Sequence, residues 1–293
     1  MSCPNSDSPI NISTTANVLS CEVFCSYMHQ YKDSACTATY YPDHVKLSYD
    51  ATTSAAVTFN NEGYNVREIN IYAPSIHMYN GSSADAEMLI IHDGAGKKLI
   101  VSIPLVQSNN TASSAKILDD IIGKFSSTVD KTKTNDSQLI NVQNYNMENF
   151  IPSSPYYFYM GGAPFSPCDG QYNFVVFDRT KSPVTIYADT LKTLTGLIQP
   201  SGIKAVSRSD YYYNSSGPNV KPGSGGGKKD EIYIECNPAG EDGEILYQTP
   251  PPTMNADMSM LSMDNLMHNP YLNVMIGVGL SYMALKLVGK ILS

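Results

Sequence analysis

The chain has 293 residues, enough for one large domain with appendages and a substantial hydrophobic core. Only 16% of the residues are charged and the formal net charge is −8, so the basic footprint typical of nucleic-acid and polyanion binders is missing. The 21 Tyr and the abundant Ser, Thr and Asn favour strands and turns over long helices.

Short strands separated by turns are predicted between residues 8 and 177, with one more strand directly afterwards. Segments rich in Val, Ile, Tyr and Thr indicate these strands, at 44–50, 55–59, 66–72, 87–93, 98–105, 173–177 and 184–188. The sequence Asp-Gly-Ala-Gly, which joins 87–93 to 98–105, predicts a hairpin. The sequence therefore predicts a mainly β domain of the α+β class.

Two helices are expected at the edge of this sheet. The first is predicted over 112–125, with Ile117, Ile121 and Ile122 on one face behind serine caps, and the second over 189–197. Both are short compared with the total predicted strand content, so we expect a twisted sheet with a few peripheral helices.

The composition changes after Pro200. A Gly-rich basic stretch predicts a flexible loop, a further strand is expected at 231–235, and the proline run at 249–253 predicts a stiff linker. We therefore divide the chain into a β domain (1–248), a Pro- and Met-rich linker (249–269) and a C-terminal hydrophobic helix (270–293).

The last segment has the composition of a membrane anchor. No charge occurs from Pro270 through Leu280 to Leu285, and a helix over 270–293 would be about 36 Å long against a hydrocarbon core of about 30 Å. Lys286 and Lys290 lie one turn apart and can reach the headgroups. Three placements stay open: a span, a helix packed on other proteins, and a helix lying on the membrane surface. The N-terminus lacks the basic and apolar regions of a secretory signal, so we expect synthesis in the cytoplasm.

Three stretches in register resemble motifs of the alpha-class carbonic anhydrases. The S-P-I-N-I sequence at 8–12 is similar to the N-terminal motif of that family. The stretch 64–92 is similar to the run that carries its zinc ligands, and 156–177 is similar to its Y-Y-x-Y-x-G and P-P-C region. The resemblance covers about residues 1–224 and implies a carbonic anhydrase-like twisted central sheet.

The resemblance also implies that the catalytic metal site is degenerate. Three histidines hold zinc in the family, and the matching positions here hold Asn70, Tyr72 and Leu89. The hydroxyl residue that orients the zinc-bound hydroxide is matched by Pro164, which has no donor. Glu87 matches an acid that orients the third histidine, and we expect it to have nothing to orient. These four replaced positions (Asn70, Tyr72, Leu89 and Pro164) are called the degenerate site below. We expect no metal, no cofactor and no enzymatic activity.

A disulfide between Cys3 and Cys168 is implied by the same resemblance, because extracellular members of the family pair cysteines at these two positions. Two free thiols are the alternative. The pairing of the other four cysteines, at 21, 25, 36 and 236, stays open.

A degenerate carbonic anhydrase-like domain followed by an apolar tail is similar to the carbonic-anhydrase-like envelope protein of poxviruses. This resemblance implies a non-catalytic virion protein of a large DNA virus, made in the host cytoplasm. Its expected partners are other capsid or virion proteins and, through 270–293, the viral inner membrane. The alternative is a virion surface adhesin for host-cell glycans, although the charge of −8 disfavours sulfated glycans.

Overall fold

The structure is a computed structural model that describes residues 3–4, 6–13, 18–21, 24–181 and 183–220. These residues belong to the compact unit Met1–Gly227. The strand expected at 231–235, the domain end at 248, the linker 249–269 and the hydrophobic segment 270–293 lie outside them. Within the described ranges, no helix combines the length and the apolar character needed to cross a bilayer.

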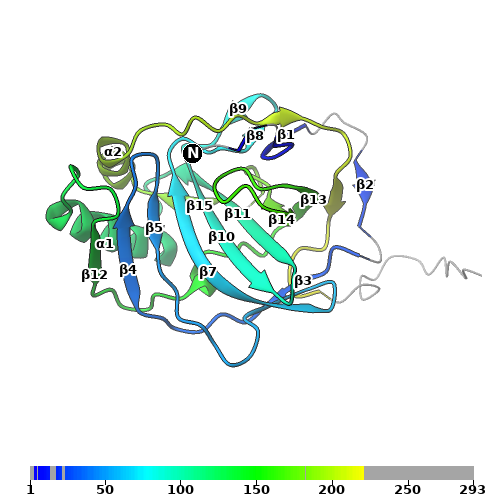
Figure 1. The fold of residues 1–293 in the computed structure, drawn as a ribbon, viewed down its shortest axis with the longest axis horizontal. Helices are drawn as coiled ribbons and strands as arrows, with labels where there is room; N and C mark the ends of the chain where they lie inside the picture. Colours follow the sequence, from blue (N-terminus) through cyan, green and yellow to red (C-terminus); the bar gives the residue numbers. More distant parts are fainter. Residues whose placement is uncertain (1–2, 5, 14–17, 22–23, 182, 221–293) are drawn as a thin grey trace, which may run out of the picture. The chain divides into compact units, whose positions relative to one another are not determined.

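A thirteen-stranded sheet dominates the described part of the chain (Figure 1). Its main path runs β12-β4-β5-β7-β10-β11-β14-β13-β17-β2, with β15 paired to β11, and β6 paired to both β3 and β7. A second sheet has the order β16-β1-β8-β9. The strands are β1 (Ile10–Ile12), β2 (Leu19–Ser20), β3 (Tyr27–His29), β4 (Cys36–Tyr40), β5 (Val45–Leu47), β6 (Val57–Phe59), β7 (Glu62–Tyr72), β8 (Met78–Tyr79), β9 (Ser82–Ser83), β10 (Ala86–Gly94), β11 (Lys98–Gln107), β12 (Ser137–Ile140), β13 (Tyr156–Gly162), β14 (Gln171–Phe177), β15 (Val184–Ile186), β16 (Val206–Ser207) and β17 (Tyr212–Asn214).

Each of the seven predicted strand segments contains a strand, and the predicted hairpin joins β10 to β11. In its turn the Gly94 N–H donates to the Lys97 carbonyl at 2.8 Å, and Gly96 has a φ of 75°, which a side chain would disfavour. Ten of the seventeen described strands were not among the predicted segments: β1, β2, β3, β4, β8, β9, β12, β13, β16 and β17. The strand predicted over 184–188 is shorter in the structure and ends at Ile186.

Two α-helices and a short 3-10 helix, η1 (Met147–Asn149), accompany the sheet in the described residues. The helices α1 (Ser113–Thr128) and α2 (Ala188–Leu197) match the two predicted helices and lie beside β12 and β4 in Figure 1. The expected serine caps of α1 are wrong: the N-cap is Ala112, which makes no side-chain hydrogen bond, and both Ser113 and Ser114 are inside the helix.

The two faces of the sheet bury separate hydrophobic clusters. On one face, Ile121 and Phe125 of α1 pack in the same cluster as alternate sheet residues such as Ile90. On the other face, the cluster includes Leu89 and Ile10, the latter from the second sheet. The degenerate site lies on this second face.

Candidate functional site

The register between β7 and β10 brings the three replaced ligand positions together. Asn70 pairs with Leu89, and Tyr72 pairs with Glu87. Because side chains alternate along a strand, Asn70 and Tyr72 project from one face, next to the cross-strand neighbour Leu89. All three are buried, with exposed fractions of 3%, 1% and 0%.

Pro164 belongs to the loop after β13, and this loop packs on the same face. Its neighbours Ala163 and Phe165 share a hydrophobic cluster with Tyr72 and Leu89. The Pro164 carbonyl accepts a hydrogen bond from the Cys3 N–H at 3.2 Å. The loop therefore brings apolar side chains where the family would present a hydroxyl group.

The donor set at the degenerate site does not fit zinc. Leu89 has no ligand atom, and Asn70 offers only a neutral amide. Burial, followed by the nearby carboxylates of Asp43 and Glu87, raises the pKa of Tyr72 well above its usual value, so its phenol keeps its proton at neutral pH. Across the described ranges, no cluster of three His, Cys, Asp or Glu side chains could hold a metal ion.

An aromatic stack lies against the degenerate site, and the sequence did not indicate it. The His44 ring stacks on Tyr41 with a centroid distance of 4.5 Å, and it lies 5.1 Å from the ring of Tyr72. Lys46, which pairs with Asn70 across β5 and β7, donates from Nζ to the Tyr41 hydroxyl at 3.2 Å. In the sequence, the two-residue spacing of His44 and Lys46 indicates only that their side chains share one face of a strand. The sequence does not show that this strand pairs with the one that carries Asn70 and Tyr72.

One buried polar atom at the site is unsatisfied. Asn70 Oδ1 has no hydrogen-bond partner among the residues that the structure describes. A buried acceptor that has lost its water hydrogen bonds costs about 1–3 kcal/mol. The rest of the amide is not without a partner, because the Asn70 side chain makes a hydrogen bond with the phenol of Tyr72.

Glu87 does have partners, so the expectation that it would have nothing to orient is wrong. Its Oε1 accepts hydrogen bonds from His77 Nδ1 and Ser102 Oγ, both at 2.5 Å. Its Oε2 accepts from the backbone N–H groups of Ile76 and His77, at 2.7 and 3.1 Å. On the far side of the imidazole, Tyr159 Oη lies 2.8 Å from His77 Nε2.

The side chains of this Glu87 network are inaccessible to solvent, and the Glu87 carboxyl is ionised. Glu87, His77 and Ser102 are all 0% exposed. Burial opposes ionisation of Glu87, but the His77 imidazole and the Ser102 hydroxyl together hold the pKa of the carboxyl below its usual value. Because no substrate can reach these groups, we assign the network a structural role.

A second buried histidine is held neutral on the opposite face of the sheet. His92 Nε2 lies 2.9 Å from Tyr31 Oη, and Nδ1 lies 3.4 Å from the Leu99 carbonyl. Burial lowers the pKa of His92 to about 3. Like His77, His92 is a hydrogen-bonded core residue.

Two disulfides are present in the described part of the chain. Cys3 pairs with Cys168, as the resemblance implied, and Cys21 pairs with Cys25, a pairing that the sequence left open. Cys36 is a buried free thiol, and burial raises its pKa to about 12. The Cys3–Cys168 bridge ties the N-terminal segment to the loop that carries Pro164.

No protein-family model matches the chain, and no curated protein matches it. Among solved structures, dioscorin complexed with ascorbate is 19% identical with a TM-score of 0.59, covering 72% of this chain and 86% of that one.

Two carbonic anhydrases match in the same way. The alpha-carbonic anhydrase of Thermovibrio ammonificans is 16% identical, with a TM-score of 0.56 and coverage of 72% of this chain and 87% of that chain. Carbonic anhydrase Cah3 of Chlamydomonas reinhardtii is 15% identical, with a TM-score of 0.59 and coverage of 71% and 90%. Identities this low show the fold alone: the described domain has the fold of the alpha-carbonic anhydrases.

Proposed function

We propose that this chain is a non-catalytic structural protein of the virion of a large DNA virus. The carbonic anhydrase-like domain makes contacts with other capsid or virion proteins, and residues 270–293 anchor the chain to the viral inner membrane or to neighbouring subunits. The observation that carries the non-catalytic part is the buried set of Asn70, Tyr72 and Leu89, which has no ligand for zinc.

The rest of the proposal is supported by composition. Only 16% of the residues are charged, and depletion of charge is typical of the core of a protein interface. The uncharged run from Pro270 to Leu285 is long enough to contribute a strong apolar anchor, at about 25 cal/mol per Å² buried.

The anchor is tested by membrane extraction. The full chain is expressed in cells, and the membranes are washed with alkaline carbonate, which removes peripheral proteins. We expect the full chain to stay with the membranes and a chain that ends at residue 269 to be released. Exchange of Lys286 and Lys290 for arginine keeps the charge and should leave retention unchanged. Equal retention of the shortened chain would refute the anchor.

The catalytic part is tested with the purified full chain after incubation with zinc. We expect CO₂ hydration at the rate of buffer alone and no zinc retained after dialysis. Chelator-sensitive turnover, or one zinc ion per chain, would show that the site is active.

The second candidate function is a surface adhesin for host-cell glycans. It is favoured by a polar groove beside α1, which is described below. This function does not require the degenerate site. The net charge of −8 disfavours binding of sulfated glycans, which are anionic.

A further inference from the structure

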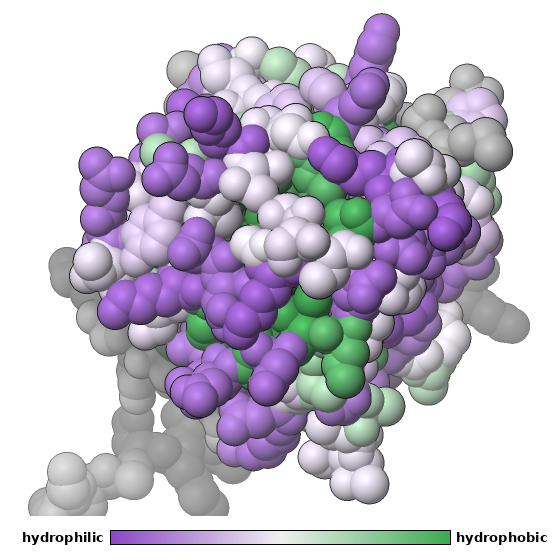
Figure 2. Space-filling view, turned by 90° about the vertical axis from the view of Figure 1, so that its left-hand side faces the viewer, coloured by the Kyte–Doolittle hydropathy of each residue, from purple (hydrophilic) through white to green (hydrophobic). Residues whose placement is uncertain are grey.

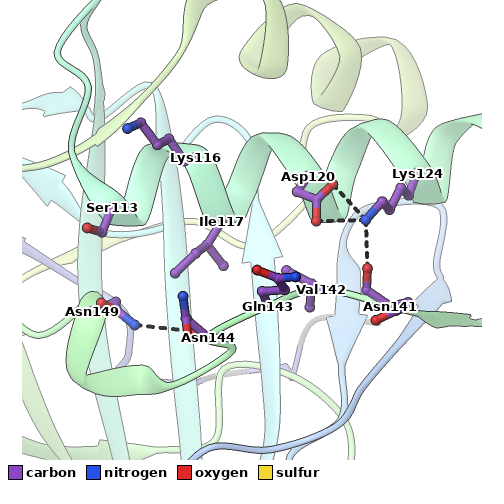
Figure 3. Close-up of a pocket in the computed structure, with 10 residues that line it drawn as sticks. All are labelled: Ser113, Lys116, Ile117, Asp120, Lys124, Asn141, Val142, Gln143, Asn144 and Asn149. Carbon is purple, nitrogen blue, oxygen red and sulfur yellow. Dashed lines mark hydrogen bonds and ion pairs between the residues drawn. The ribbon is translucent and has the colours of Figure 1, made fainter.

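A groove of about 490 Å³ lies between α1 and the segment 141–149 that follows β12 (Figure 3). One wall is the helix, and the other is the loop that leads into η1. The groove lies far from the degenerate site in the fold, because α1 packs on the opposite face of the sheet. Its volume is within the range of small-molecule sites.

Carboxamides dominate the loop wall. Asn141, Gln143, Asn144 and Asn149 all line the groove. Asn149 Nδ2 donates to the Asn144 carbonyl at 3.1 Å, which fixes the loop. The side chains of Asn141, Gln143 and Asn144 are exposed and form no hydrogen bond with any other described residue, so each offers a free donor and a free acceptor.

The groove carries little net charge. Lys124 Nζ lies 2.8 Å from Asp120 and donates to the Asn141 carbonyl at 2.6 Å, so its charge is compensated. Lys116 is also at the rim, but Figure 3 shows its side chain directed away from the 141–149 segment. Lys116 has no ion-pair partner among the described residues, so the charged side chains that line the groove (Lys116, Asp120 and Lys124) sum to a single positive charge, at the rim.

The bottom of the groove is apolar. Ile117 points from α1 toward the loop in Figure 3 and is only 7% exposed, and Val142 lies beside it. Figure 2 shows this side of the molecule, where hydrophobic residues appear between hydrophilic side chains. A ligand in the groove thus meets apolar contacts below and paired donors and acceptors at the side.

We propose that this groove binds a neutral saccharide unit. Each sugar hydroxyl is both a donor and an acceptor, which matches a carboxamide, and the C–H face of the ring matches Ile117 and Val142. The carboxamide wall itself carries no charge, and Lys116 points away from it, so recognition there is by hydrogen bonds to uncharged hydroxyl groups. The inference rests on the second candidate function, the glycan adhesin, and gives that function its site and its class of ligand; it does not depend on the proposed anchor at 270–293.

The test uses saturation-transfer NMR on the full chain with three probes: N-acetylglucosamine, galactose and a sulfated heparin disaccharide. We expect at least one neutral sugar to bind in the millimolar range and the sulfated probe not to bind. Replacing Gln143→Leu should weaken that binding by about two- to tenfold, because a neutral hydrogen bond contributes about 0.5–1.5 kcal/mol. Gln30→Leu is the matched control, since Gln30 is an exposed amide outside the groove, and it should change nothing.

Three results would overturn the proposal. The first is that neither neutral sugar gives a transfer signal. The second is that the sulfated disaccharide binds in their place. The third is that Gln143→Leu and Gln30→Leu affect binding equally, which would place the sugar elsewhere.

Discussion

His77 Nδ1 lies 2.5 Å from Glu87 Oε1, and both side chains are fully buried. This pair joins β10 to the loop before β8, on the face that carries the degenerate site. The Glu87 carboxylate thus links these two parts of the chain through buried hydrogen bonds.

We predict that the Glu87–His77 pair is a major contributor to stability. Glu87→Gln and His77→Gln are each expected to lower the free energy of unfolding by about 3–5 kcal/mol, because each leaves a buried polar partner unsatisfied. Urea denaturation measures both, and the double variant should lose less than the sum of the two. Glu62→Gln is the control: Glu62 forms an exposed ion pair with Lys97, so its replacement should leave the free energy of unfolding nearly unchanged. Strict additivity of the buried pair would contradict its coupling.

Restoring imidazoles should restore metal binding without activity. The combined variant Asn70→His, Tyr72→His and Leu89→His places three histidines at cross-strand positions of the β7–β10 pair. We expect about one zinc ion per chain by elemental analysis, since three imidazoles suffice for an open tetrahedral site. Turnover should stay absent because Pro164 supplies no hydroxyl. The unaltered chain is the control, and a folded variant without zinc would show that these positions do not converge as ligands.

Replacing the unsatisfied amide should stabilise the domain. Asn70→Leu removes Oδ1, which is buried without a partner, and is expected to raise the free energy of unfolding by about 1 kcal/mol. Asn214 provides a matched control, because its Oδ1 accepts from the N–H groups of Ser216 and Gly217. Asn214→Leu should destabilise by about 2 kcal/mol. A loss of stability in Asn70→Leu would mean that the amide has a role that the fold does not explain.

The stability of the domain should fall in mild acid because of His92. In the folded state its pKa is about 3, against 6.5 in the unfolded chain. Between these values the unfolded state binds one proton more, so stability rises with pH across the window by about 1.4 kcal/mol per pH unit. His92→Gln should remove this slope, as measured by urea midpoints at several pH values. His29→Gln, at a partly buried histidine on β3, is the comparison. Unchanged slopes in His92→Gln would contradict the assignment.

The two disulfides should differ in their effect on stability. Cys3 and Cys168 are 165 residues apart in sequence, whereas Cys21 and Cys25 are four apart. In the chain-entropy model, the long loop contributes about 5 kcal/mol and the short loop about 2 kcal/mol. Serine exchange of each pair, followed by urea denaturation, measures both. Equal losses would indicate that native-state contacts outweigh loop closure.

The sequence determined the class of the fold, both α-helices and seven of the seventeen described strands. Runs rich in Val, Ile, Leu and Tyr marked β7, β10, β11 and β14. In β10 and β11 these runs are nearly continuous, because both faces of these strands are buried. The strand β4, with the sequence CTATY, was not predicted because its small and polar residues form too weak a hydrophobic pattern. The serine caps of α1 were misjudged by one residue, since Ala112 occupies the cap.

The tertiary structure decided what the candidate site contains. The replaced ligand positions could be read from the motifs, but a motif names positions and not their neighbours. Only the folded register showed that His77 and Ser102 satisfy Glu87, and that His44 stacks beside Tyr72. The physical reason is that these contacts join residues from separate strands and loops. Hydrogen-bond partners across a sheet are set by strand order and register, which a local sequence pattern does not encode.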